Sequence, residues 1–95
     1  MEANGYKIEP FAQLAGAVLI DEDLTCADFT RANLSETDLS GAHLSGNYSF
    51  ANFCEADLTD AHLAYVDLRD VNLSGANLTQ ANLTGATMPD GTIHS

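Results

Sequence analysis

Residues 71–85 read VNLSG ANLTQ ANLTG, three consecutive five-residue units with the same order of residue types. In each unit a large apolar residue stands third, a small residue stands two positions before it, and Asn separates the two. The same order extends from residue 12 to about residue 90, with Asp or His often replacing Asn and with Ser or Thr commonly in fourth place. One five-residue pattern therefore organises nearly the whole chain.

A period of five residues fits neither regular secondary structure. On an α-helix, five residues turn the apolar position by about 140°, which scatters the leucines around the cylinder. On a flat strand, successive leucines point to opposite faces. A chain that turns a corner of about 90° after every unit closes one coil in four units and places the first and third residues of each unit inside. The pattern therefore predicts an all-β coil that buries its leucines and exposes its polar residues.

The units have the form A-(D/N)-L-x-x, and more than a dozen of them follow one another. This repeat resembles the pentapeptide-repeat family. The resemblance implies a right-handed quadrilateral β-helix, a solenoid with four units to a coil and about four coils in this chain. The segment MPDGTI at residues 88–93 also resembles the ends of small family members that are common in photosynthetic bacteria.

The repeat divides the chain into three parts. Residues 1–11 precede it, and we expect them to form an N-terminal cap or a disordered lead. We expect residues 12–90 to form the β-helix, with an irregular coil near residues 45–50, and residues 91–95 to form a C-terminal tail. With 95 residues, of which 45% are hydrophobic, the chain is too small for an ordinary globular core. Contacts between stacked coils must therefore supply the stability.

The segment AHLSGNYSFANF, residues 42–53, breaks the period, because its leucine and its second phenylalanine are nine residues apart instead of ten. We favour the loss of one residue, with Tyr48 as the central apolar residue of the shortened unit. Gly46 can take the backbone angles that a tight corner needs. The lost residue would then be the small inward one before Asn47.

This interpretation stacks the central residues in four columns: Leu14, Leu34, Phe53 and Leu73; Leu19, Leu39, Leu58 and Leu78; Leu24, Leu44, Leu63 and Leu83; and Phe29, Tyr48, Leu68 and Met88. Each interior Leu would contribute about 1.5–3 kcal/mol by burial. The alternative interpretation is an insertion of four residues that loops out of one coil. It would place Phe29 directly against Phe53.

The charge is strongly negative, with 14 acidic residues against Lys7, Arg31 and Arg69 and a net charge of −11. Nucleic-acid phosphates and anionic membranes would be repelled, so we expect no direct nucleic-acid binding and no membrane binding. The sequence shows no signal-peptide pattern and no apolar run of transmembrane length. Cys26 and Cys54 are too few and too far apart for a disulfide framework. We expect a cytoplasmic protein with reduced thiols.

One pair of histidines raises the possibility of a metal site. His43 and His62 precede the central residue in adjacent coils of one column, and Asp23 lies one coil below them. Two imidazoles stacked in this way could share a metal ion. Outward side chains on a ladder are solvated, however, and no supporting groups are evident. A polar ladder is therefore the favoured interpretation, and metal binding is the minor one.

The carboxylates and thiols give no catalytic site. The pairs Asp38 with Asp57 and Glu36 with Glu55 follow automatically from the repeat, and no pocket or phosphate-binding loop accompanies them. Cys54 has no obvious His partner or basic neighbour to lower its pKa. We therefore expect no catalytic residue, no cofactor and no enzymatic activity.

Two features of the polar positions predict local structure. Asn33, Asn52 and Asn72 fall in one column, where stacked amides are expected to hydrogen-bond along the rod. Glu22 occupies a position that other units give to a small inward residue. Because an unpaired buried carboxylate is costly, we expect the corner at Glu22 to be distorted or open to water.

Exposed aromatic residues mark the most plausible contact surface. Phe50 and Tyr65 occupy the last positions of their units, so they are expected to face outward or to line corners. Arg31 would lie beside Phe50 and add a cation–π contact or a charge at the rim. These three residues are the predicted anchors for a protein partner.

The sequence thus favours a non-enzymatic structural or protein-interaction module whose partner is unknown. The resemblance to the family implies an alternative, a DNA-mimicking binder or inhibitor of a topoisomerase, because some members present an acidic rod in place of DNA. Metal binding through His43 and His62 is the third hypothesis. We expect a monomer, because the net charge opposes association and a turn at Pro89 and Gly91 partly blunts the C-terminal edge. An end-to-end dimer is the alternative.

Overall fold

Each five-residue unit ends in a tight turn. In the computed structural model, which describes residues 1–94, the N–H of Ala17 donates to the carbonyl of Leu14 at 2.9 Å, and the same bond recurs unit after unit. In most units the fifth residue takes the left-handed conformation, with φ of 74° at Gly16 and 58° at Glu36; Asp70 is an exception. A type II turn requires a positive φ at this place. These turns are the corners that the five-residue period predicts.

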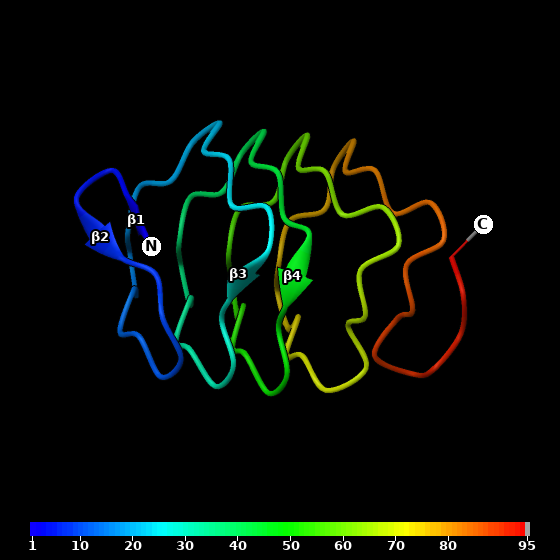
Figure 1. Ribbon diagram of the computed structural model, residues 1–95. Helices are drawn as coiled ribbons and strands as arrows, with labels where there is room; N and C mark the ends of the chain where they lie inside the picture. Colours follow the sequence, from blue (N-terminus) through cyan, green and yellow to red (C-terminus); the bar gives the residue numbers. More distant parts are fainter. Residues whose placement is uncertain (95) are drawn as a thin grey trace.

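Parallel bridges join the second residues of units that lie 20 or 19 positions apart. They form four ladders: the first through Gln13, Asn33, Asn52 and Asn72; the second through Val18, Asp38, Asp57 and Asn77; the third through Asp23, His43, His62 and Asn82; and the fourth through Asp28 and Asn47 and then through Asp67 and Thr87. On the fourth ladder, the strands β3 (Ala27–Asp28) and β4 (Gly46–Asn47) pair in parallel. The molecule is a β-helical solenoid, 34 Å along its longest axis and 23 × 22 Å across (Figure 1).

The interior is filled by the third residues of the units and by the small residues two positions before them. Leu19, Leu39 and Leu58 are at most 1% exposed, as are most central residues of the other three columns. The predicted columns are confirmed, because the backbone bonds run between the expected neighbours, as from Leu19 N–H to Asp38 and from Leu39 N–H to Asp57. Thr37 takes one inward position, and its buried hydroxyl donates to the carbonyl of Leu14 at 3.0 Å.

The irregular unit has lost one residue, as predicted, but the missing residue is a different one. Tyr48 is 1% exposed and stacks on Phe29, and Phe53 continues the first column, so no segment loops out. Gly46 pairs with Ala27, so Gly46 itself fills the place of the small residue. The unit that begins at Ala42 therefore ends at Ser45, and the residue that it lacks is the fifth one, at the corner. Gly46 is needed for space rather than for a positive φ, since a Cβ there would overlap the carbonyl oxygen of Ala27.

The corner at Glu22 is open to water, as one of the two predicted alternatives has it, but it is not distorted. The carbonyl of Glu22 accepts from the N–H of His43 at 3.0 Å, and the N–H of Asp21 donates to Ser40 at 2.9 Å, as in regular units. Glu22 is half-buried and therefore keeps contact with water. The rigid ladder holds the backbone in place, while the flexible side chain turns its carboxylate toward solvent.

An antiparallel hairpin lies at each end of the rod (Figure 1). At the N-terminus, β1 (Glu2–Ala3) pairs with β2 (Tyr6–Lys7), and Ile8, which follows β2, is buried over the first coil. The N-terminal hairpin and Ile8 therefore cover the end of the first coil. At the C-terminus the chain turns back after residue 88, and Ile93 pairs with Thr87 on the fourth ladder. Ser95, the end of the predicted tail, lies outside the described residues. Residues 1–94 contain no helix that is long and apolar enough to cross a membrane.

The 71–88 coil keeps an open edge on the other three ladders. In the preceding coils, the N–H of the central residue and the carbonyl of the small residue bond to the next coil. Among residues 1–94, no backbone partner is found for the N–H groups of Leu73, Leu78 and Leu83 or for the carbonyls of Val71, Ala76 and Ala81. The C-terminal hairpin thus blunts the edge on one ladder, as predicted for its turn, and leaves the other three unpaired.

Candidate functional site

The outward Asp and Asn side chains act mainly within their own units. The Oδ1 atom of Asp57 accepts from the N–H and the hydroxyl of Thr59 at 3.0 and 2.6 Å. The bond from the hydroxyl has the largest effect and the bond from the N–H the next largest, and together they hold the pKa of Asp57 below its usual value. Asp23, Asp28 and Asp90 have lowered pKa values for the same reason. The motif of an Asp or Asn two residues before Ser or Thr is therefore a local brace for the exposed face.

The predicted amide ladder does not form as expected. The Oδ1 atoms of Asn33, Asn52 and Asn72 accept from the backbone N–H two residues ahead, at 3.1, 2.9 and 3.0 Å. No hydrogen bond joins one of these amides to the next within the described part of the chain. The bond within the unit forms in place of a bond between stacked amides, because its backbone donor is already fixed two residues away.

The structure brings His43 and His62 together. Their rings stack with centroids 4.2 Å apart and planes 1° from parallel, and both side chains are exposed. Asp23 adjoins His43 on the third ladder, but its Oδ1 atom accepts from Thr25. Within residues 1–94, no group of three or more His, Cys, Asp or Glu side chains converges on one point.

The other candidate chemical groups stay apart from any cleft. Asp38 and Asp57 adjoin on the second ladder, and the hydroxyls of Ser40 and Thr59 occupy their Oδ1 atoms. Cys26 and Cys54 are free thiols in different coils, and no bond joins them. These side chains brace or cover the surface, and none lines the cleft described below.

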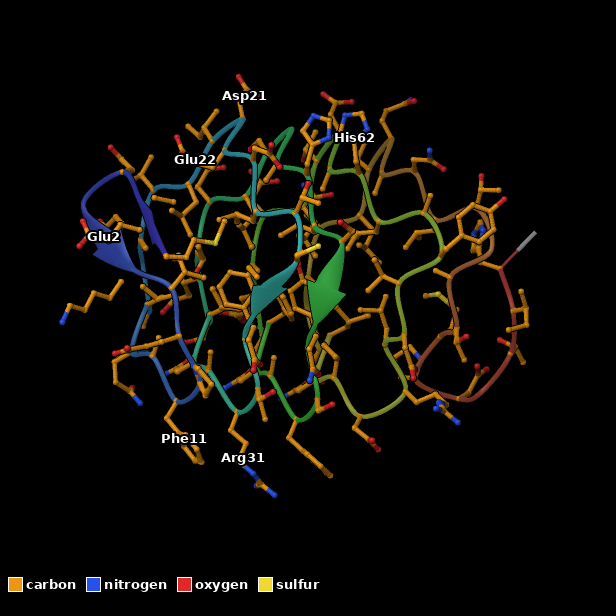
Figure 2. All side chains as sticks on the ribbon, viewed as in Figure 1. Glu2, Phe11, Asp21, Glu22, Arg31 and His62 are labelled. Carbon is orange, nitrogen blue, oxygen red and sulfur yellow. The ribbon has the colours of Figure 1, made fainter. Side chains whose placement is uncertain are left out.

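One corner of the solenoid carries an exposed aromatic row, which we define as Phe11, Arg31 and Phe50. The three residues occupy the same corner in successive coils, because Phe11 N–H donates to Thr30 and Arg31 N–H donates to Ser49. The guanidinium carbon of Arg31 lies 4.6 Å from the ring centroid of Phe50, which confirms the predicted cation–π contact. Phe11 and Phe50 are 65% and 55% exposed, and Figure 2 shows Phe11 and Arg31 projecting from the same side of the rod.

Phe11 was not among the predicted contact residues, although its position in the sequence indicates the same corner. It immediately precedes the first Ala of the repeat, just as Arg31 and Phe50 precede the Ala residues that open their coils. The corner position could therefore have been extended back by one unit. Tyr65, in contrast, lies on another corner and is not brought to Phe50. Its ring is 78% exposed and lies so close to Gly85 that a Cβ there would overlap it.

A cleft adjoins the aromatic row where the fourth ladder is interrupted. Within residues 1–94, no bridge joins Asn47 to Asp67, and no backbone hydrogen bond joins residues 46–50 to residues 65–70. The gap is a cleft of about 170 Å³ lined by Gly46, Asn47, Tyr48, Ser49, Asp67 and Asp70. Arg69 pairs with Asp67 at 2.8 Å, and both side chains are more than half exposed, so this ion pair adds little stability.

The core beneath the cleft is aromatic. The Tyr48 ring lies 5.3 Å from Phe29, nearly parallel to it, and 5.7 Å from Phe53 at a steep tilt. We predicted that its hydroxyl would find a partner or a route to water. Instead the hydroxyl is buried and has no hydrogen-bond partner among the described residues, and burial raises the pKa of Tyr48. Removing this hydroxyl should therefore cost no hydrogen bond.

The arrangement is matched by known proteins. The model of the family described as pentapeptide repeats matches residues 11–46 and 51–88 in eight copies, and it leaves out the irregular residues 47–50. A pentapeptide repeat protein from the Arabidopsis thaliana thylakoid lumen is 36% identical over 80% of this chain and 54% of its own, with a TM-score of 0.58. One from Nostoc PCC 7120 is 34% identical over 84% of this chain and 64% of its own, with a TM-score of 0.57.

A third solved structure, a pentapeptide repeat protein from the cyanobacterium Cyanothece 51142, is 32% identical over 90% of this chain and 63% of its own, with a TM-score of 0.51. The chain therefore spans less than two thirds of each of these three proteins. No curated protein matches the sequence.

Proposed function

The chain belongs to the pentapeptide-repeat family, whose members are generally structural or protein-interaction modules, and we propose that this one is a non-enzymatic module that docks a protein partner. The observation that supports the proposal is the exposed aromatic row of Phe11, Arg31 and Phe50, which adjoins the cleft on the fourth ladder. We further propose that the scaffold is the right-handed quadrilateral helix of about four coils that the resemblance implies.

The solenoid suits such a role because its surface is fixed by its backbone. Each corner residue is held by a turn, and each exposed side chain next to it is repeated at the spacing of paired strands, about 4.8 Å. Phe11, Arg31 and Phe50 all have a positive φ, from 57° to 65°. A partner therefore meets side chains whose backbone is ordered before binding, which lowers the entropic cost of association.

The chemistry of the surface indicates the kind of partner. Two exposed phenylalanines offer apolar area, which is typical of the residues that anchor protein contacts. Asp67 and Asp70 line the neighbouring cleft, and the whole chain has a net charge of −11. A protein segment with an apolar anchor and Lys or Arg side chains would complement both features.

The test is capture of partners from the source cell with the parent protein and with a Phe11→Ser, Phe50→Ser double variant. Val18→Ser with Ile20→Ser is the matched control, because these side chains are also exposed, at 46% each, and lie away from the row. We expect a partner that the parent and the control capture and that the double variant loses. Identical capture by all three proteins, with equal unfolding midpoints, would contradict the proposed surface.

Tyr65 needs a separate variant, because it lies on a different corner from Phe50. Tyr65→Ser tests whether the tyrosine predicted as an anchor contributes to binding or only covers Gly85. Loss of the same partner would extend the docking surface across the fourth ladder. Unchanged capture would restrict the surface to the aromatic row and the cleft.

Mimicry of DNA is a second candidate function, favoured by the position of the acidic residues. Carboxylates gather on the second ladder and its two corners: Asp21, Glu36, Asp38, Glu55, Asp57 and Asp60. These carboxylates lie in three successive coils, which at about 4.8 Å between coils span about 10 Å, or about three base-pair steps of about 3.4 Å. A gyrase-type supercoiling assay tests this function. If the protein at micromolar concentration neither inhibits the enzyme nor binds to it, this function is excluded.

We propose that the protein is monomeric. The terminal edge is unpaired on three ladders, but the C-terminal hairpin adds a strand on the fourth and would hold a second rod away. The net charge opposes association as well. Sedimentation at several protein and salt concentrations tests this proposal, and a dimer that salt promotes would favour end-to-end pairing instead.

We also propose a cytoplasmic location, which tagging in the source cell would test.

A further inference from the structure

Two histidines stand side by side on the third ladder, between Asp23 and Asn82. His43 and His62 are joined by a parallel bridge, and their exposed rings stack 4.2 Å apart. We propose that this pair is a binding site for a divalent transition-metal ion. The proposal does not depend on the protein partner, because the histidines lie away from the aromatic row.

The ligand chemistry selects the class of metal. Neutral imidazole is a good ligand for Zn²⁺, Ni²⁺ and Cu²⁺, with bonds of about 2.0–2.1 Å to zinc. The two rings are parallel, so a modest rotation of each exposed ring is needed to direct one nitrogen from each toward a shared ion. The backbone bonds from Leu44 N–H to His62 and from His62 N–H to Ala42 fix the spacing of the two units. The ladder therefore brings the two ligands together before the metal binds.

The surroundings favour a cation. Asp23 adjoins His43 on the ladder, and only its Oδ1 atom accepts a hydrogen bond within the described chain. Asp21 and Glu22 project from the same side of the rod as His62 (Figure 2). Negative potential from these carboxylates raises the local concentration of cations. Because no third protein ligand converges on the pair within residues 1–94, water would fill the remaining coordination positions.

The position of the pair gives the metal a structural consequence. His43 belongs to the 32–50 coil and His62 to the 51–70 coil. These are the two coils that lack their rung between Asn47 and Asp67 on the adjacent fourth ladder. A metal held by both imidazoles would tie these coils together beside that gap. Binding to the folded state alone stabilises that state, so the metal should raise the unfolding midpoint.

The experiment titrates Zn²⁺ and Ni²⁺ into the protein at about pH 8, above the ordinary imidazole pKa of about 6.5. Both thiols are replaced by Ser in every sample, so that they cannot bind the metal. Calorimetry and thermal unfolding compare the parent with His43→Ala, His62→Ala and His94→Ala. His94 is the matched control, because it is an exposed histidine at the C-terminal hairpin, outside the stacked pair.

We expect one saturable site per chain in the parent and in His94→Ala, with a higher unfolding midpoint when the metal is present. Either substitution in the pair should weaken binding by about 10²-fold, because the second ligand no longer acts at high effective concentration. The metal should then no longer raise the midpoint. Equal affinity in all four proteins, or no saturable binding by the parent, would overturn the proposal.

Discussion

Within residues 1–94, two stretches of backbone lack the partners that the rest of the solenoid has, and they lie on opposite sides of the 51–70 coil. One is the gap between Asn47 and Asp67 on the fourth ladder, and the other is the open edge of the 71–88 coil. The side chains behind them differ. Tyr48 beneath the gap is 1% exposed, whereas Leu73 and Leu78 behind the edge are only half-buried.

In the regular coils, burial by the neighbouring coil and hydrogen bonding along the rungs occur together, whereas in these two regions they are separate. At the gap, a coil is present above and aromatic rings fill the interior, so the core stays closed although a rung is missing. At the edge, the backbone of the 71–88 coil is regular, but within residues 1–94 no further coil covers Leu73 and Leu78. Burial in this protein therefore depends on the neighbouring coil more than on each hydrogen-bonded rung, as expected for a solenoid.

The charges of the two regions differ as well. Asp67 and Asp70 line the gap, and Arg69 pairs with Asp67. Residues 71–89 contain no charged residue at all. The unpaired groups at the gap can therefore be hydrated among charged side chains, whereas those at the edge face water from a neutral surface.

The largest effect should come from removing the ring beneath the gap. Tyr48→Ala leaves a cavity between Phe29 and Phe53 and should lower the free energy of unfolding by about 3–5 kcal/mol. Tyr48→Phe is the control and should be neutral or stabilising by about 1 kcal/mol, because the buried hydroxyl has no partner among residues 1–94. Urea unfolding measures both. A loss of several kcal/mol in Tyr48→Phe would show that the hydroxyl is bonded and that the gap is organised differently.

A second pair of variants compares an interior coil with the terminal one in the same column. Leu39 is fully buried and Leu78 is half-buried. Leu39→Ala should cost about 2–5 kcal/mol, as buried leucines do. Leu78→Ala should cost about 1 kcal/mol, since part of its side chain is already in water. Equal losses in denaturant unfolding would mean that the terminal leucines are covered in solution, which would favour the end-to-end dimer.

The shortened corner should be sensitive to a single methyl group. In Gly46→Ala, the new Cβ would overlap the carbonyl oxygen of Ala27, so we expect a loss of about 1–3 kcal/mol by overpacking. Gly16→Ala meets no atom within 4 Å but keeps a strained φ of 74°, and it should cost about 1 kcal/mol. If urea unfolding finds Gly46→Ala harmless, the coil would have relaxed at the gap, and the close approach of the two strands would not be required.

The smallest effect concerns the acidic brace on a ladder that is complete. The pKa of Asp57 is lowered in the folded state, so its stabilisation is present above the unfolded pKa of about 3.9 and is lost as the pH falls through the lower folded value. Asp57→Asn keeps the Oδ1 acceptor for Thr59. It should leave stability at neutral pH nearly unchanged and make acid unfolding less steep. A marked loss at neutral pH would show that the charge itself supports the ladder.

Several features of the molecule could be read from the sequence because they depend on residues close together in the chain. The five-residue period fixed which side chains point inward, and the nine-residue spacing before Phe53 indicated the loss of one residue. Arg31 and Phe50 were placed together by counting units, and the contact is present. Phe11 could have been added by the same count.

Two features could not be read in this way: the identity of the missing residue and the regular backbone at Glu22. Both depend on backbone contacts between stacked coils, such as that of Ala27 with Gly46. The hydrogen bonds of the Asn side chains, in contrast, are local to their units and could have been read from the sequence. The cleft between Asn47 and Asp67 depends on the same stacking. The sequence by itself determined a solenoid with leucines inside, because the repeat encodes a direction for every side chain. Only the tertiary structure decided which rung is absent and which surface is open, because those follow from distances between coils that are 20 residues apart in the chain.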